Sequence, residues 1–192
     1  MRAGCRRRGF TLVELMITVS VIAILGLVVA PGIFAYIPKY RVDQAGRALA
    51  AEMSLARIRA IARNRTHHVA FDASAQTITV YQDDDNDWST ANTVVKTISI
   101  PTRFPKVLLD YNNVTAVGGG TITQAATFGS TSAPVRATFL PNGLLAQPGV
   151  FYLMPEGDKD TRNDRLRAVQ VGRAGQVTLY RYDPATASWE EM

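Results

Sequence analysis

The sequence predicts an α+β fold in which one long N-terminal helix packs on an antiparallel β-sheet. Three observations lead to this prediction. Residues 10–37 carry a single charge, and residues 39–65 repeat apolar side chains every three or four positions, which is the spacing of a helix with one buried face. From residue 66 onward, short alternating segments rich in β-branched residues are separated by turn residues, as expected for strands and hairpins.

The apolar stretch at residues 10–37 is long enough to cross a membrane, because a hydrocarbon core of about 30 Å needs roughly 20 apolar residues. Glu14 is its only charged residue. A carboxylate inside such a span costs about 2.5–3.5 kcal/mol on insertion scales, so it marks a function or a partner cation. Arginines on the N-terminal side of a span hold that side in the cytoplasm. Four of them precede it: Arg2, Arg6, Arg7 and Arg8.

Two prolines interrupt the helical pattern. Pro31 removes one backbone hydrogen bond and crowds the preceding turn, so a helix break is expected at Pro31 and Gly32, and Pro38 predicts a second break near the membrane exit. Residues 38–65 then predict an amphipathic helix, with Ile58 and Ile61 widening its apolar face. That face is formed by Val42, Ala45, Leu49, Met53, Ala56 and Ala60.

The rest of this second helix is basic, with seven basic and two acidic residues between positions 39 and 65. One interpretation is a solvated surface that also packs against acidic neighbours. The other is a patch for nucleic acid or anionic lipid. No aromatic residue lies between Arg41 and Arg65, so this run of arginines offers no platform for base stacking.

Residues 66–192 are expected to form a β-rich head. Pro141-Asn142-Gly143 is a strong turn signal, and the glycine-rich segment 112–127 predicts a flexible loop or ragged hairpin. Seven or eight strands on the helix are expected, at residues 67–72, 77–81, 92–100, 107–109, 135–140, 150–154, 166–171 and 176–182.

The run Gly9-Phe10-Thr11-Leu12-Val13-Glu14, after a basic leader and ahead of an apolar helix, resembles the prepilin-peptidase site of type IV pilins and type II secretion pseudopilins. An ordinary secretory signal fits less well, since its cleavage site follows the apolar region. The resemblance implies cleavage after Gly9, N-methylation of Phe10, and pairing of Glu14 with the N-terminal amine of an adjacent subunit during assembly. A proline at the position of Pro31 is also typical of that family.

The same resemblance implies a pilin-like lollipop with four parts. Residues 1–9 form a leader, 10–37 a transmembrane and assembly helix, 38–65 an amphipathic periplasmic helix, and 66–192 the head. Implied partners are other pilin or pseudopilin subunits, prepilin peptidase and an inner-membrane assembly platform. The implied location is the bacterial inner membrane, crossed once with a cytoplasmic N-terminus and a periplasmic head, and then a periplasmic or surface filament.

Three further features resemble the H-type (GspH/FimT-type) minor pseudopilins and minor pilins. They are residues 56–65 with the strand that follows, the turn Phe139-Leu140-Pro141-Asn142-Gly143, and the closing pattern Val169-Gln170-Val171-Gly172-Arg173 with Val177. Cys5, the only cysteine, lies in the leader, so the mature chain is expected to have no disulfide and to depend on its core. Major pilins often carry a disulfide, so the expected absence of one here favours a minor subunit.

The distribution of charge indicates that the basic leader sets the orientation of the chain in the membrane. The chain has 21 basic and 16 acidic residues, a formal net charge of +5. Removing the four leader arginines leaves 17 basic residues against 16 acidic ones, which is nearly neutral.

Few residues carry site chemistry. Asp83, Asp85 and Asp87 are calcium candidates, although the EF-hand pattern fails because its glycine and glutamate positions hold Trp88 and Val94. His67 and His68 are adjacent, so on a strand they point to opposite faces and cannot share a metal. No nucleophile motif or phosphate loop is present. We therefore expect a non-enzyme with no cofactor and no metal.

The predicted function is that of a minor pseudopilin or minor pilin, at or near the tip of a type II secretion pseudopilus or type IV pilus, that helps to initiate filament assembly. Both branches share every motif quoted. The alternative is a DNA-binding minor pilin of a transformation pilus. The head has ten basic and thirteen acidic residues, so DNA binding requires a local patch and nucleic acid is not the expected partner. The candidate arginines are Arg162, Arg165, Arg167, Arg173 and Arg181.

A third possibility is a single-span periplasmic protein with no filament role. It leaves the spacing of Gly9, Phe10 and Glu14 unexplained.

Overall fold

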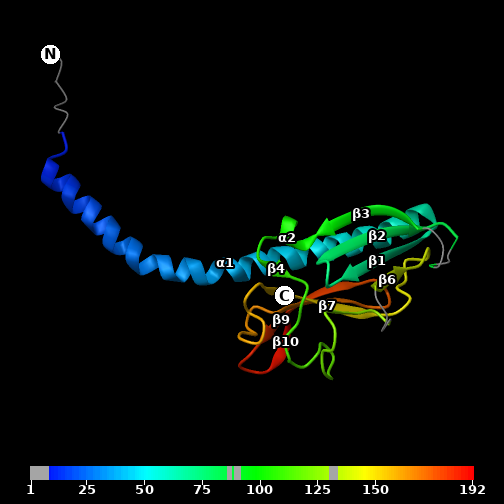
Figure 1. Ribbon diagram of the computed structural model, residues 1–192. Helices are drawn as coiled ribbons and strands as arrows, with labels where there is room; N and C mark the ends of the chain where they lie inside the picture. The colour runs from blue at the N-terminus through cyan, green and yellow to red at the C-terminus, as the bar shows by residue number, and fades with distance from the viewer. Residues whose placement is uncertain (1–8, 86–87, 89–91, 130–133) are drawn as a thin grey trace, which may run out of the picture. The chain divides into compact units, whose positions relative to one another are not determined.

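A computed structural model of the chain describes residues 9–85, 88, 92–129 and 134–192, without the side chains of residues 28–31. Residues 1–8 of the expected leader and Asp87 lie outside the described part. The chain divides into two compact units, Met1–Ile37 and Pro38–Met192. One long helix, α1 (Leu12–Arg63), contributes to both units (Figure 1).

The first unit is helical and its apolar side chains are exposed from Phe10 through Tyr36, as far as they are described. Two of its hydroxyl groups, on Thr18 and Ser20, donate to the carbonyls of Leu15 and Met16 at 2.8 Å each. Among the described residues, no single helix has the length and hydropathy of a membrane span. The stretches Leu12–Leu27 and Gly32–Arg63, joined across a bend, meet both conditions together.

The backbone of α1 stays helical at both prolines. The predicted second break at Pro38 is therefore wrong. A proline inside a helix removes one backbone hydrogen bond, but its fixed φ is close to the helical value, so the neighbouring turns continue. The bend falls over residues 28–31, next to Gly32, and a helix break at Pro31 and Gly32 stays a prediction.

In the second unit, α1 buries the predicted apolar face. Val42, Ala45, Leu49, Met53, Ala56 and Ala60 are all at most 2% exposed. The predicted widening of this face by Ile58 and Ile61 is wrong, since both are at least half exposed. At about 100° per residue, Ile58 points away from the buried face and Ile61 lies on its flank.

A four-stranded antiparallel sheet lies on one side of this part of α1, in the order β3-β2-β1-β6. β1 pairs with β2 from Thr66 opposite Asp83 to Asp72 opposite Thr77, and with β6 from His67 opposite Phe139 onward. Six of the seven β1 residues are buried, so both faces of this central strand are covered. The strands are β1 (Thr66–Asp72), β2 (Thr77–Asp83), β3 (Thr93–Ser99) and β6 (Val135–Phe139).

A second antiparallel sheet has six strands in the order β10-β9-β8-β7-β4, with β5 also paired to β7. The expected terminal hairpin is its β8–β9 pair, registered from Arg167 opposite Arg181 to Val171 opposite Val177. The strands are β4 (Val107–Leu108), β5 (Ala126–Thr127), β7 (Gly149–Pro155), β8 (Arg167–Val171), β9 (Val177–Asp183) and β10 (Ser188–Glu191).

The antiparallel α+β fold is confirmed, and the structure adds three elements that the sequence did not predict. The described part of the chain holds ten strands in two sheets rather than seven or eight on one sheet. The additions are α2 (Ile100–Arg103), β5 and β10. β5 has two residues and β10 has four, and such lengths are too short for a period-2 pattern to emerge.

The main core lies between α1 and the two sheets. It combines Leu49 of α1 with residues of both sheets, such as Phe71, Phe139 and Val169. The Phe71 ring lies 5.2 Å from that of Phe128 and 5.1 Å from that of Phe151, measured between centroids. Burial of this apolar surface is the main source of the stability of the head.

A second cluster covers the other face of the larger sheet. Val114 and Ile122 pack there against Tyr152, Leu166 and Tyr182. Both come from the glycine-rich segment predicted to be a flexible loop or a ragged hairpin, and an isolated antiparallel bridge joins Thr115 to Thr121 within it. That segment contributes buried apolar side chains and is therefore a packed part of the head.

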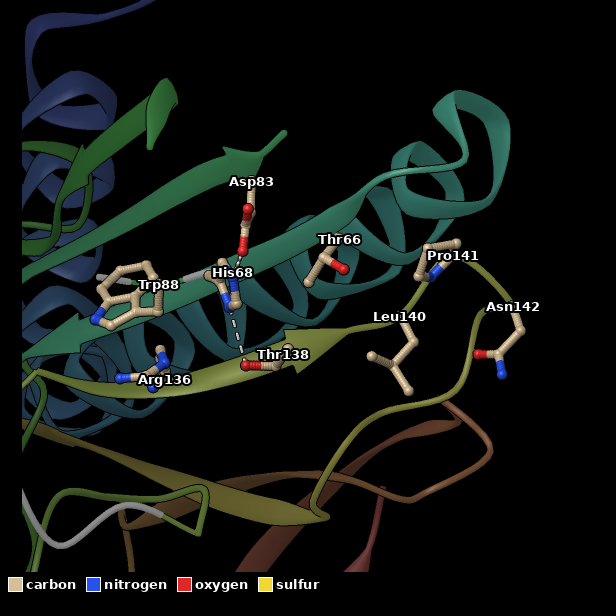
Figure 2. Close-up of a pocket in the computed structure, with 9 residues that line it drawn as sticks. All are labelled: Thr66, His68, Asp83, Trp88, Arg136, Thr138, Leu140, Pro141 and Asn142. Atoms are coloured by element: carbon tan, nitrogen blue, oxygen red, sulfur yellow. Dashed lines mark hydrogen bonds and ion pairs between the residues drawn. The ribbon is translucent and has the colours of Figure 1, made fainter. Parts of the chain in front are cut away.

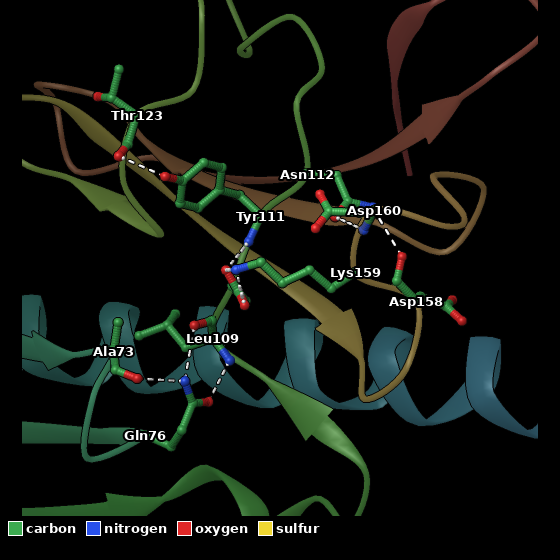
Figure 3. A network of polar contacts seen from close by, with 10 residues as sticks. Ala73, Gln76, Leu109, Tyr111, Asn112, Thr123, Asp158, Lys159 and Asp160 are labelled. Atoms are coloured by element: carbon green, nitrogen blue, oxygen red, sulfur yellow. Dashed lines mark hydrogen bonds and ion pairs between the residues drawn. The ribbon is translucent and has the colours of Figure 1, made fainter.

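Polar contacts fix the start of that segment (Figure 3). The Gln76 amide pairs with the Leu109 backbone in both directions, donating to its carbonyl at 3.0 Å and accepting from its N–H at 2.7 Å. Buried Asn112 donates to the carbonyl of Asp158 at 3.1 Å and accepts from the N–H of Asp160 at 2.9 Å. These contacts hold the charged loop at residues 156–165 against the head.

Two leucines on α1 give a matched test of this packing. Leu49 is 2% exposed and Leu55 is 42% exposed. Leu49→Ala is expected to lower the free energy of unfolding by about 2–5 kcal/mol, because it leaves a cavity in the main core. Leu55→Ala should change it by less than about 0.5 kcal/mol. Urea unfolding of the full chain in detergent micelles measures both; equal losses would contradict this account of the core.

Candidate functional site

The N-terminal motif forms the start of α1. Thr11 precedes the first helical residue, Leu12, and its hydroxyl oxygen accepts a hydrogen bond from the N–H of Glu14 at 3.2 Å. This is the helix N-cap arrangement, which satisfies one of the unpaired N–H groups of the first turn. Thr11 was not predicted as a functional residue. The pattern Thr-x-x-Glu, which is typical of a capping box, is the signal that identifies it.

Glu14 lies in the first turn of α1 with an exposed side chain. The positive end of the helix dipole favours a carboxylate there. That effect, worth about 0.3–1 kcal/mol at an exposed site, is smaller than the roughly 2.5–3.5 kcal/mol cost of the carboxylate in a membrane span. The dipole alone is therefore too weak to offset that cost. Gly9 and Phe10 precede the helix, and Phe10 is 75% exposed.

The acidic residues that begin at the end of β2 include one, Asp83, that is paired within the head. Asp83 is buried, and its Oδ2 lies 2.9 Å from His68 Nε2. Its Oδ1 accepts from the N–H of Asp85 at 3.1 Å. Both carboxylate oxygens of Asp83 are thus engaged. Among the described residues, no group of three or more His, Cys, Asp or Glu side chains is placed to hold a metal ion. Asp87, the third calcium candidate, lies outside the described residues.

The two histidines of β1 contact different partners. His68 Nδ1 lies 3.0 Å from the Thr138 hydroxyl, while His67 Nδ1 lies 3.1 Å from the Arg65 carbonyl. Burial lowers the pKa of His68, although the hydrogen bond and charge of Asp83 act to raise it. Burial also lowers the pKa of His67, against the hydrogen bond to Arg65 and with the help of the nearby Arg63 and Arg59 charges. Both imidazoles are therefore neutral near pH 7.

Most of the arginines proposed for DNA are paired with carboxylates. Arg167 is completely buried, and its Nε lies 2.5 Å from Asp43 on α1, so it is not available to a phosphate. Arg181 lies 2.5 Å from Glu190, while Arg162 and Arg165 lie 3.4 Å and 4.0 Å from Asp164. Arg173 is exposed in the turn after β8. The five do not form an uncompensated basic patch.

Arg57 joins the three segments that carry the family resemblance. From α1, its Nε donates to the carbonyl of Gly143 at 3.0 Å, and its NH1 lies 3.5 Å from the carbonyl of Gly175. Gly143 ends the Pro-Asn-Gly turn after β6, and Gly175 lies in the turn between β8 and β9. The two turns also meet through the N–H of Leu145, which donates to the Arg173 carbonyl at 2.9 Å.

Both glycines are required at this contact. Gly143 has a φ of +80° and Gly175 a φ of +76°, a region that other residues rarely adopt. A Cβ at Gly175 would lie 2.6 Å from Arg57 Nε, and one at Gly143 would lie 2.7 Å from a methyl group of Ile61. The sequence places Arg57 on the basic surface of α1, and nothing in its position there indicates that the two turns close over it.

The fold and the N-terminal motif together define a class of protein. A helix with one carboxylate in its first turn and an otherwise apolar N-terminal half, followed by an antiparallel head, is the organisation of pilin-like filament subunits. In agreement with this, the sequence profile of the prokaryotic N-terminal methylation motif matches residues 4–30.

The profile of the type II transport protein GspH matches residues 45–175, and the chain belongs to this family of minor pseudopilins and minor pilins. Its predicted membership is confirmed. No curated protein matches the chain significantly.

Similar solved structures include two of this type. The minor pseudopilin EpsH from the type 2 secretion system of Vibrio cholerae is 14% identical, with a TM-score of 0.44 and coverage of 73% of this chain and 97% of that one. The type IV minor pilin FimU of Pseudomonas aeruginosa is 15% identical, with a TM-score of 0.46 and coverage of 81% and 96% respectively.

Replacing Arg57 is expected to weaken the contact between α1 and the two turns. Arg57→Met should lower the free energy of unfolding by about 1–3 kcal/mol, since it leaves the partly buried carbonyl of Gly143 without its side-chain donor. Arg47→Met, which removes the same charge from an exposed position on α1, should change it by less than about 0.5 kcal/mol. Chemical unfolding of the full chain in micelles compares the two; a similar effect of both would show that only charge matters.

The histidines predict a pH dependence of stability. Their pKa values are lowered in the folded chain from the ordinary value of 6.5. As the pH falls through this value, the unfolded chain takes up protons first, so the free energy of unfolding should decrease between about pH 7.5 and pH 5.5. Since the chain has two histidines, His68→Gln should reduce the slope of this decrease. A stability that rises toward pH 5.5 would contradict the lowered pKa values.

Proposed function

We propose that the chain is a minor subunit at or near the tip of a type II secretion pseudopilus or type IV pilus, where it helps to start filament assembly. The observation that carries this proposal is the single carboxylate of Glu14 at the start of an exposed apolar helix. Membership of the GspH family supports it. The lack of any cysteine after Cys5 also favours a minor subunit over a major one.

Processing at the N-terminus is the first step of the proposed mechanism. Prepilin peptidase removes residues 1–9 by cutting after Gly9 and methylates the new amino group of Phe10. Gly9 and Phe10 lie outside α1, and Phe10 is largely exposed, as a peptidase needs. Until the cut is made, the leader arginines keep this end on the cytoplasmic side of the inner membrane.

The cut also creates the cation that Glu14 requires. The new α-amino group of one subunit pairs with the Glu14 carboxylate of its neighbour when the two apolar helices stack. Such a pair in a medium of low dielectric constant is far stronger than one in water, and an unpaired carboxylate there is costly. Stacking in the correct register is therefore favoured over a lone subunit or a shifted one.

The head supplies the rest of the proposed interactions. It extends into the periplasm and contacts neighbouring heads in the filament, and the inner-membrane assembly platform lifts the subunit from the membrane. The exposed basic residues of α1 in the second unit, such as Arg47 and Arg63, are positioned on the head surface to meet acidic neighbours.

Glu14→Gln tests the assembly role while keeping the size of the side chain. The variant should insert in the membrane and be cut normally, but its recovery in isolated filaments should fall about tenfold or more, because the neutral amide lacks the charge-assisted pairing with the amine. Ser20→Ala is the matched control, because it changes another polar residue of the same apolar stretch. The Ser20 hydroxyl bonds within its own helix, so this variant should assemble normally.

The intact mass of each variant, purified from its own membranes, verifies processing. A mature chain beginning at Phe10 with one added methyl group is expected for all of them. Normal incorporation of Glu14→Gln would refute the pairing mechanism. An uncut chain from cells with an active peptidase would refute the processing step.

A further inference from the structure

The head contains a cavity of about 580 Å³ on the face of the smaller sheet that carries His68 (Figure 2). Strands β1, β2 and β6 provide its floor, and the turn after β6 provides one wall. The cavity is separate from the N-terminal assembly motif, and nothing in the proposed filament function uses it. Its lining is Thr66, His68, Asp83, Trp88, Arg136, Thr138, Leu140, Pro141 and Asn142.

Arg136 is the one arginine in this lining, and an aromatic ring positions its guanidinium group. Its guanidinium carbon lies 4.6 Å from the centre of the Trp88 ring. Trp88 is fixed in turn by edge contacts with His68 and Tyr81, whose ring centres lie 4.8 Å and 5.4 Å away. A guanidinium stacked on an aromatic ring keeps its N–H groups available at its edge.

Arg136 forms no hydrogen bond or ion pair with any residue in the described part of the chain. This distinguishes it from Arg162, Arg165, Arg167 and Arg181, which all have carboxylate partners. A planar guanidinium with free N–H groups at the mouth of a cavity is suited to bind a carboxylate through two parallel hydrogen bonds.

Buried polar groups form the floor of the cavity. His68 Nε2 donates to Asp83 at 2.9 Å, and in the neutral ring His68 Nδ1 accepts from the Thr138 hydroxyl at 3.0 Å. The Asp83 negative charge is therefore covered by the imidazole. If His68 gains a proton, Nδ1 becomes a donor to the same Thr138 oxygen. The Thr138 hydroxyl hydrogen is then free to turn into the cavity and becomes a second donor to a ligand.

We propose that this cavity binds a carboxylate group of an acidic peptide segment, held by Arg136 and bound more tightly when His68 is protonated. The apolar wall of Leu140 and Pro141 accommodates the chain that carries the carboxylate. The charged groups that face His68 are Asp83 from β2 and Arg136 from β6, while His67, on the same strand, contacts Arg65 instead. A bound carboxylate adds a negative charge that offsets Arg136 and favours the imidazolium.

Linkage fixes the direction of the pH effect. Since the bound carboxylate favours protonated His68, protonation of His68 must favour the carboxylate by the same factor. Affinity therefore rises as the pH falls toward about 5.5, a range in which an aspartate side chain is still ionised. A nucleic acid is the less suitable ligand, because Arg136 covers a face of Trp88 and two other rings also contact Trp88. The head also has an excess of acidic residues.

Fluorescence of Trp88 provides the test. The full chain in detergent micelles is used with Trp189→Phe, which leaves Trp88 as its only tryptophan. Three capped tripeptides are titrated: N-acetyl-Ala-Asp-Ala-amide, the same peptide with Asn in place of Asp, and N-acetyl-Ala-Ala-Ala with a free carboxyl end. A saturable change is expected with a carboxylate peptide and none with the Asn peptide. Comparing the Asp peptide with the free-end peptide shows whether the cavity prefers a side-chain carboxylate or the carboxylate of a chain terminus.

Two variants connect the signal to the proposed groups. Arg136→Gln should weaken binding about tenfold or more, because a charged hydrogen-bond pair is lost, whereas Arg173→Gln, an equal loss of charge from an exposed turn, should not. Affinity for the carboxylate peptide should rise about fivefold from pH 7.5 to pH 5.5. Thr138→Val, which keeps the shape of the floor and removes the hydroxyl relay, should reduce this rise.

Four results would overturn the proposal. They are equal responses to the Asp and Asn peptides, equal losses in the two arginine variants, tighter binding of a thymidine tetranucleotide than of either carboxylate peptide, and an affinity that does not change with pH. Circular dichroism of each variant confirms that a lost signal is not lost folding. None of these results depends on whether the chain assembles into a filament.

Discussion

The head depends on one close contact, the packing of a narrow apolar face of α1 between two sheets. Three of the six residues of that face are alanines, Ala45, Ala56 and Ala60, and all are fully buried. Small side chains let the helix backbone approach the strands closely, so both sheets share one core with the helix. With no cysteine after Cys5, this apolar contact does the work that a disulfide does in many small secreted domains.

Buried charges supplement the apolar contact. Asp43 of α1 reaches Arg167 of the larger sheet, and Glu52 of α1 is bonded to Lys96 and Arg103. Burial acts to raise the pKa of Glu52, but the two cations together lower it. Each pair connects the helix to a different part of the head. Such pairs add little net free energy, but removing one partner leaves a buried charge unpaired, so they penalise any alternative docking of the helix.

The parts of this structure that sequence could predict are those with a repeating pattern or a fixed motif. The buried face of α1, the β1–β2 and β8–β9 hairpins and the GspH membership all have such signals. The structure differs where a contact joins distant segments. Arg57 contacts turns 86 and 118 positions away, and Asp83, predicted as a calcium candidate, is instead a partner of buried His68. In both cases the residue type is compatible with several environments, and only the tertiary packing selects one.

The order of the strands has a consequence for the timing of folding. The central strand β1 needs β6, about seventy positions later in the chain, and the core face of α1 needs β7 and β8, about a hundred positions later. Contacts at such separation close late, because a long loop must be ordered first. A chain synthesised from its N-terminus therefore carries the core side of its helix uncovered until nearly all of the head has been made. Folding of the head is consequently completed only after β8 has been made, and a chain truncated before β8 lacks the surface that its first helix needs.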